Sequence, residues 1–134
     1  MKVFISYAHE DREIAKRLVR QLEGAGLEVW DDSSILPGDN WAEKVSQALK
    51  ESQAMVVLVS VAALDSEWVR REIEFALGTK EYRGRLIPVF VGRRDDIPED
   101  KLPWILRRLH GVELTDQAEE ESLEQVVHAL SHAD

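Results

Sequence analysis

The segment AMVVLVS (54–60) is the most apolar run of the chain, and it decides the fold. Strands that are covered by helices on both faces have such continuous apolar runs, because neither face meets water. We therefore expect residues 54–60 to form the central strand of a parallel sheet. Four further short runs, each rich in β-branched or other apolar residues, are the other expected strands: VFIS (3–6), LEVW (27–30), RLIPVFVG (85–92) and GVEL (111–114).

Amphipathic stretches separate these runs. In residues 11–23, apolar side chains follow one another at intervals of three or four, which places them on one face of a helix. The same spacing predicts helices over 41–52 and 122–132, and another that Ser66 caps and that extends to about Lys80. This alternation predicts a doubly wound, flavodoxin-like α/β fold with five parallel strands in the order 2-1-3-4-5 and helices on both faces.

Two parts of the chain fit this pattern less well. Pro88 interrupts the run 85–92, and proline cannot donate a ladder hydrogen bond, so we expect this strand near the edge of the sheet. Residues 93–110 are typical of a loop that contains one or two helical turns at WILRRL. The fold prediction therefore depends on the other segments.

Length and charge limit the function classes. The chain has 134 residues, and we expect a single domain over 1–134. Its net charge of −9 argues against nucleic acid as a partner. Most of that charge lies in residues 109–134, which hold seven acidic side chains and no lysine or arginine, whereas residues 1–108 have a net charge of −2.

Cysteine and long apolar segments are both absent from the sequence. With no cysteine, disulfides, thiol nucleophiles and thiolate metal sites are excluded. No apolar stretch approaches the roughly 20 residues that span a membrane, so we expect no membrane contact in this segment and a cytoplasmic protein.

The residues that follow the strands distinguish the doubly wound families. A phosphate-receiving regulator domain needs acidic residues after its first strand and an aspartate after its third, but Tyr7-Ala8-His9 and Ser60-Val61 stand there. A flavodoxin needs a hydroxyl-rich loop after the first strand, which residues 7–11 do not provide. The glycine fingerprint of dinucleotide-binding folds is absent as well.

Four segments resemble the Toll/interleukin-receptor (TIR) domain family. VFISYAHED (3–11) is similar to its opening segment, and LEVWDDSSILPGDNW (27–41) to its second strand and the BB loop that follows. LVSVAALDSEWVRREIEFAL (58–77) resembles the third strand and an S-x-W-x-x-x-E segment, and RLIPVFV (85–91) the fourth strand. The four matches come in the order of the family and span most of the chain.

The resemblance implies one of two functions. In its enzyme members, which cleave NAD at the nicotinamide–ribose bond, a glutamate four residues after the tryptophan is catalytic, and Ser66 and Trp68 place it at Glu72. The chain would then be an NAD nucleosidase of bacterial signalling or defence. It would be activated by self-association and would release nicotinamide with ADP-ribose or a cyclic isomer. The alternative is a non-catalytic interaction domain that binds other TIR domains.

The surroundings of Glu72 also favour a functional side chain. The alternative interpretation is a solvated helix glutamate in an i,i+4 ion pair, and Arg70 and Arg71 stand at such spacing from Glu67 and Glu74. No basic residue stands three or four positions from Glu72. A lone carboxylate suffices to stabilise positive charge on a ribose, so we expect no cofactor and no metal, and the four histidines lack a ligand spacing.

The resemblance implies further site residues. Substrate contacts would come from these positions: Ala8, His9, Pro37, Trp41 and Trp68. Several enzymes of the family have arginine where Ala8 and His9 stand, so phosphate contact would fall to main-chain N–H groups at the start of the first helix. A core-facing Trp41, and a Trp68 that packs beneath the site, are the alternative interpretations.

The BB loop is the expected surface for another TIR domain. It comprises Asp32, Ser33, Ser34, Ile35, Leu36, Pro37 and Gly38. The apolar tip 35–37 on an otherwise polar loop suits contact with protein. The acidic pair at the start of the loop, Asp31 and Asp32, is more typical of a loop cap. The expected partners are therefore NAD and further TIR domains.

Overall fold

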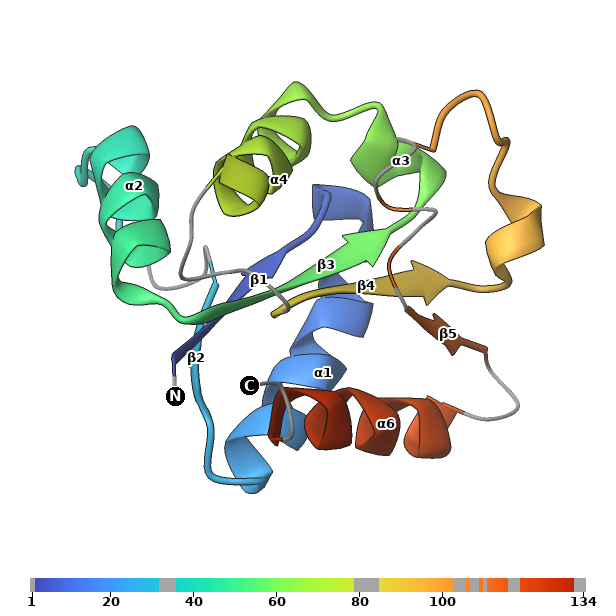
Figure 1. Ribbon diagram of the computed structural model, residues 1–134. Helices are drawn as coiled ribbons and strands as arrows, with labels where there is room; N and C mark the ends of the chain where they lie inside the picture. The colour runs from blue at the N-terminus through green and yellow to red at the C-terminus, as the bar shows by residue number, and fades with distance from the viewer. Residues whose placement is uncertain are drawn as a thin grey trace.

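The computed structural model describes residues 2–31, 36–78, 85–102, 106, 109, 111–115 and 119–131. Within them, five parallel strands form one sheet in the order β2-β1-β3-β4-β5, which confirms the predicted topology (Figure 1). The elements in chain order are β1 (Lys2–Ser6), η1 (His9–Asp11), α1 (Arg12–Gly24), β2 (Glu28–Trp30), α2 (Trp41–Glu51), β3 (Ala54–Val59), α3 (Val61–Leu64), α4 (Glu67–Gly78), β4 (Leu86–Val91), η4 (Arg94–Asp96), β5 (Val112–Leu114) and α6 (Glu119–Ser131).

Strand β3 is the centre of the sheet. All six of its residues are buried, as the apolar run predicts. It pairs on one side with β1, where Val57 lies opposite Ser6, and on the other with β4, where Val57 lies opposite Pro88. Because all the strands are parallel, their carboxyl ends lie at one edge of the sheet, where this class of fold binds its ligands.

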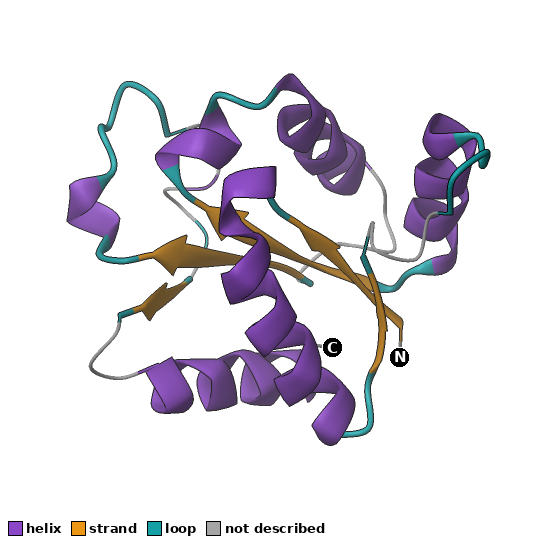
Figure 2. Cartoon of the chain, turned by 180° about the vertical axis from the view of Figure 1, so that it is seen from behind, coloured by secondary structure: helices purple, strands orange, loops and turns teal. Residues whose placement is uncertain are grey.

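Helices cover both faces of the sheet and divide the core into two clusters. Figures 1 and 2 show α2, α3 and α4 on one face and α1 and α6 on the other. Alternate residues of β3 enter the two clusters, so that Met55 and Val57 pack beneath α4, while Val56 and Leu58 pack against α1 and α6. On β1, Phe4 belongs to the cluster beneath α4.

Pro88 lies in the part of β4 that precedes the pairing with β5. Strand β5 begins at Val112, which is opposite Val89, so the β4–β5 pairing starts one residue after the proline. The expected position near the edge is therefore correct, since only the three-residue strand β5 lies outside β4.

Two helices differ from the sequence prediction. The single-turn α3 is not apparent in the sequence; it forms because the Ser60 side chain accepts a hydrogen bond from the Ala63 N–H and caps it. The last helix begins at Glu119, three residues before the predicted Ser122. Its first turn is Glu119–Glu121, and carboxylates stabilise a helix N-terminus although they carry no apolar periodicity.

The region after β4 contributes to the core. Ile97, Leu102 and Leu106 are buried in the cluster that lies beneath α4. The helical turns predicted at WILRRL (104–109) fall mostly on residues outside the described part of the structure. The role of the region is to close the α4 face of the sheet beyond β4.

Candidate active site

Glu72 is a buried charged residue in the second turn of α4. Only 6% of its surface is exposed, and it shares the inner face of the helix with Val69, Ile73 and Ala76. The outer face of the same helix carries the ion pair between Arg71 Nη2 and Glu67 Oε1, at 2.6 Å. The helix therefore directs one glutamate inward and another outward, as the sequence spacing predicts.

A serine of the first strand contacts this carboxylate. Ser6 Oγ donates a hydrogen bond to Glu72 Oε1 at 2.8 Å, between residues that are 66 positions apart in the sequence. Ser6 is the last residue of β1 and is 1% exposed. We did not identify Ser6 from the sequence. The signal that could have found it is the strand period of two, which places Ser6 on the same face as Phe4.

Glu72 lies beside a small cavity that aromatic and aliphatic residues line. The lining residues come from β1 and the residue after it, and from β2, α2 and α4: Phe4, Ile5, Tyr7, Trp30, Val45, Trp68 and Glu72. The cavity has a volume of about 20 Å³. That is room for about one water molecule, whereas ligand pockets typically measure about 300–1,000 Å³. Binding of a nucleotide here therefore requires the walls to separate.

The structure brings together two of the predicted site residues, Glu72 and Trp68, at this cavity. Ala8 is 5% exposed and packs in the core, whereas His9 and Pro37 are exposed. None of these three lines the cavity, and their predicted substrate contacts stay predictions. Trp41 begins α2 as predicted, but its side chain lies outside the described part of the structure.

The turn after β1 is held to the end of β3. Ser60 Oγ donates a hydrogen bond to Asp11 Oδ2 at 2.5 Å, and the Asp11 N–H donates to the Ala8 carbonyl at 2.9 Å. Burial raises the pKa of the Asp11 carboxyl; the Ser60 hydrogen bond opposes this shift, and the nearby charge of Glu10 adds to it. These contacts fix the segment that would hold the phosphates.

An arginine that we did not predict lies next to that segment. Arg12 Nη2 approaches His9 Nε2 at 2.7 Å, and both side chains are exposed. Arg12 is the first residue of α1, so its charge stands at the helix N-terminus where main-chain N–H groups are expected to contact phosphate. The sequence signal that could have found Arg12 is its position: it follows η1 directly and is three residues from His9, one of the positions where family enzymes have arginine.

The described part of the BB loop is a tight turn. Leu36 to Asp39 form it, with Gly38 at a φ of +92°, a value suited to glycine. The Leu36 N–H donates to Asp39 Oδ2 at 2.9 Å, and Asn40 caps α2 immediately afterwards. Leu36 is 66% exposed. The remaining predicted loop residues, Asp32, Ser33, Ser34 and Ile35, lie outside the described residues.

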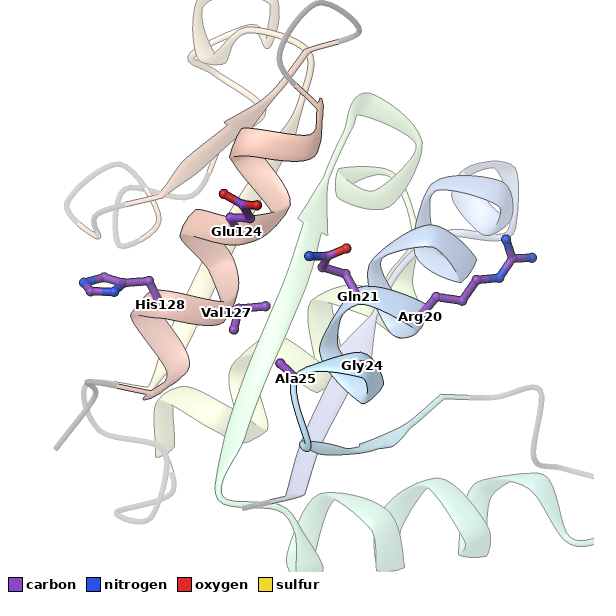
Figure 3. A pocket seen from close by; sticks show the side chains of 7 residues that line it. All are labelled: Arg20, Gln21, Gly24, Ala25, Glu124, Val127 and His128. Carbon is purple, nitrogen blue, oxygen red and sulfur yellow. The ribbon is translucent and has the colours of Figure 1, made fainter.

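The larger cavities lie elsewhere. A groove of about 510 Å³ runs between α1 and α6 on the opposite face of the sheet (Figure 3). In Figure 3 the side chains of Arg20 and His128 point away from the space between the helices, whereas the Gln21 side chain lies between them. A second cavity of about 340 Å³ lies beside β4 and β5, where Arg17 already pairs with Glu119 at 2.8 Å. Neither includes Glu72.

Among the described residues, no three histidine, aspartate or glutamate side chains are grouped so that they could hold a metal ion. None of the helices in the described ranges has the length and apolar character needed to cross a membrane.

Two curated proteins are similar to this chain in sequence. The "NAD(+) hydrolase PdTIR" of Paracoccus denitrificans is 34% identical over 92 residues, which cover 66% of this chain and 30% of that protein. The "probable 2' cyclic ADP-D-ribose synthase BdTIR" of Brachypodium distachyon is also 34% identical over 92 residues, which cover 66% of this chain and 40% of that protein. The matched segment thus covers less than half the length of either relative.

A solved structure and a family model each match nearly the whole chain. The metazoan TIR-STING receptor from C. gigas, solved in complex with 2',3'-cGAMP, superposes with a TM-score of 0.78 and 28% identity over 96% of this chain and 39% of that one. The family model described as "TIR domain" matches residues 3–127. That match covers the sheet, Glu72 and most of α6, and the chain belongs to the TIR domain family.

Proposed function

We propose that this TIR domain is an NAD glycohydrolase that breaks the nicotinamide–ribose bond, with Glu72 as the catalytic carboxylate. The single observation that carries the proposal is the inward-facing Glu72, 6% exposed, held by Ser6 beside a cavity that Trp68 also lines. The names of two relatives, an NAD(+) hydrolase and a probable cyclic ADP-ribose synthase, support the same substrate. A cytoplasmic role in bacterial signalling or defence is part of this proposal.

The proposed chemistry needs one negative charge. As the bond between the ribose and nicotinamide breaks, its electron pair leaves with the pyridine nitrogen, and positive charge develops on the ribose. A carboxylate held in a small, buried cavity stabilises that charge strongly, because little water screens it. Water then adds to the ribose and releases a proton, which yields ADP-ribose; attack by a hydroxyl group of the same molecule yields a cyclic isomer instead.

The size of the cavity links this activity to self-association. At about 20 Å³ the cavity does not admit a nicotinamide ring. We infer that contact between copies through the BB loop, where Leu36 is exposed, opens the cleft beside Glu72. The same small cavity favours the second candidate function, a non-catalytic domain that only binds other TIR domains.

The test compares two glutamates of the same helix. NAD is incubated with the wild type, Glu72→Gln and the control Glu74→Gln, and released nicotinamide is separated by chromatography. Glu74 is exposed, so its replacement should leave the rate unchanged. Loss of the buried carboxylate should lower the rate by about 100-fold or more. Circular dichroism and thermal melting establish that each variant is folded.

Two results would contradict the proposal. Undiminished cleavage by a folded Glu72→Gln protein would exclude Glu72 as the catalytic carboxylate. An absence of cleavage by the wild type, even when copies are fused or crowded into oligomers, would favour the interaction domain.

A further inference from the structure

We propose that Ser6 is a positioning residue for this reaction: its hydroxyl orients the Glu72 carboxylate toward the ribose. The inference rests on the proposed function and assigns a role to a residue of β1. The observation is the 2.8 Å hydrogen bond from Ser6 Oγ to Glu72 Oε1, between two side chains that are 1% and 6% exposed.

Both ends of this hydrogen bond are held rigidly. Ser6 ends β1, where it lies opposite Val57 of the central strand in the β1–β3 ladder. Glu72 extends from a helix that Val69 and Ile73 anchor in the core. A hydrogen bond between two fixed elements restricts the rotation of the carboxylate far more than one between mobile surface groups would.

Burial makes the hydrogen bond costly to lose. A hydroxyl or a carboxylate that is removed from water needs a hydrogen-bond partner within the protein. Ser6 Oγ and Glu72 Oε1 provide such partners for one another. The hydroxyl has a single proton to donate, and the geometry directs it at Glu72 Oε1. Donation to a carboxylate favours its charged form, which is the form that the proposed chemistry uses.

The described residues that line the cavity are mostly uncharged. Of the described residues that line the cavity, β2 contributes Trp30, α2 contributes Val45 and the end of β1 adds Tyr7. Tyr7 is the one other side chain in that lining that carries an ionisable group. The wild type and Ser6→Ala share every titratable group, so a difference between their pH profiles reports on the hydrogen bond between Ser6 and Glu72.

Ser6→Ala is the test variant, and Ser122→Ala is its matched control. Ser122 is also a buried serine, 5% exposed, whose Oγ donates to the Glu113 carbonyl at 2.7 Å in the layer on the other face of the sheet. Both variants remove one buried hydroxyl, so their effects on stability should be similar. Only Ser6→Ala should alter the catalysis.

Three effects on nicotinamide release are expected for Ser6→Ala. The value of kcat should fall by about 10- to 100-fold with little change in KM, because the carboxylate is misplaced while the substrate contacts remain. The acidic limb of the pH–kcat profile should move up by about one to two pH units. Ser6→Cys, which keeps a weak donor of similar shape, should give an intermediate kcat and provides a second variant if Ser6→Ala does not fold.

The possible results separate the two proposals. If the wild type is active, Glu72→Gln is inactive, and folded Ser6→Ala matches the wild type in kcat and pH profile, the positioning role is overturned and the proposed function stands. An equal loss of kcat in Ser122→Ala would also overturn it, since the effect would then be one of stability. If the wild type does not cleave NAD, both proposals fail together.

Discussion

The ring of Phe4 stacks on that of Trp30, and this contact should contribute measurably to stability. The ring centroids are 5.0 Å apart and the planes are 15° from parallel. The two residues lie opposite one another in the β1–β2 ladder, and Phe4 is 1% exposed. Because β2 is an edge strand of three residues, the stack is a main attachment of β2, the strand from which the BB loop departs.

The magnitude follows from the burial and the stacking. Phe4→Leu should lose about 0.5–1.5 kcal/mol of aromatic pairing and about 1 kcal/mol from a poorer fit in the core, so about 2 kcal/mol in all. For 134 residues the unfolding entropy is about 0.28 kcal/mol per kelvin, which converts this loss into a Tm lower by about 7 °C.

A double-mutant cycle isolates the stacking. The free energies of unfolding of the wild type, Phe4→Leu, Trp30→Leu and the double variant are measured by urea titration, followed by circular dichroism. The double variant should lose about 1 kcal/mol less than the two single variants together, because the pair is already broken in each single variant. Losses that add to within about 0.3 kcal/mol would refute the reasoning, since the rings would then not interact.

Two further predictions concern Asp11 and Leu36. Burial raises the folded pKa of Asp11 above its ordinary value of 3.8, so the stability that this group contributes is present at low pH and is lost as pH rises through the folded pKa. Asp11→Asn, which does not ionise, should therefore gain stability relative to the wild type between about pH 4 and pH 7 in urea titrations; a constant or falling difference would contradict this. Leu36→Glu, at a side chain 66% exposed, should weaken both self-association in sedimentation velocity and the rise of specific activity with protein concentration. Leu77→Glu, at a side chain 44% exposed on α4, should change neither, and equal effects of the two would exclude a specific role of the BB loop.

The sequence predicts the fold well because its signals are local. The apolar run of β3 and the helical spacing in α1 and α4 each depend on neighbours within a few residues, and the strand order follows from the fold class. Elements without apolar periodicity were missed or shortened. The turn of α3 depends on a cap from Ser60, and the first turn of α6 consists of three glutamates.

The site is predicted less completely because its contacts cross the fold. The resemblance to the TIR family, supported by the spacing on α4, indicates Glu72 and Trp68 as candidate site residues. The partners of buried groups were not apparent, since the hydrogen bond from Ser6 to Glu72 spans 66 residues and that from Ser60 to Asp11 spans 49. The closed cavity could not be predicted either, because it depends on how the side chains of four elements pack.

The arrangement of α4 and α6 on opposite faces of the sheet separates two electrostatic environments. The exposed glutamates of α6 lie two packed layers from Glu72, or roughly 20 Å at about 10 Å per layer. The Debye length at physiological ionic strength is about 8 Å, so a charged ligand that approaches the α4 face through solvent is largely screened from these glutamates. The acidic helix can therefore keep the protein dispersed by mutual repulsion without repelling a dinucleotide that carries phosphates.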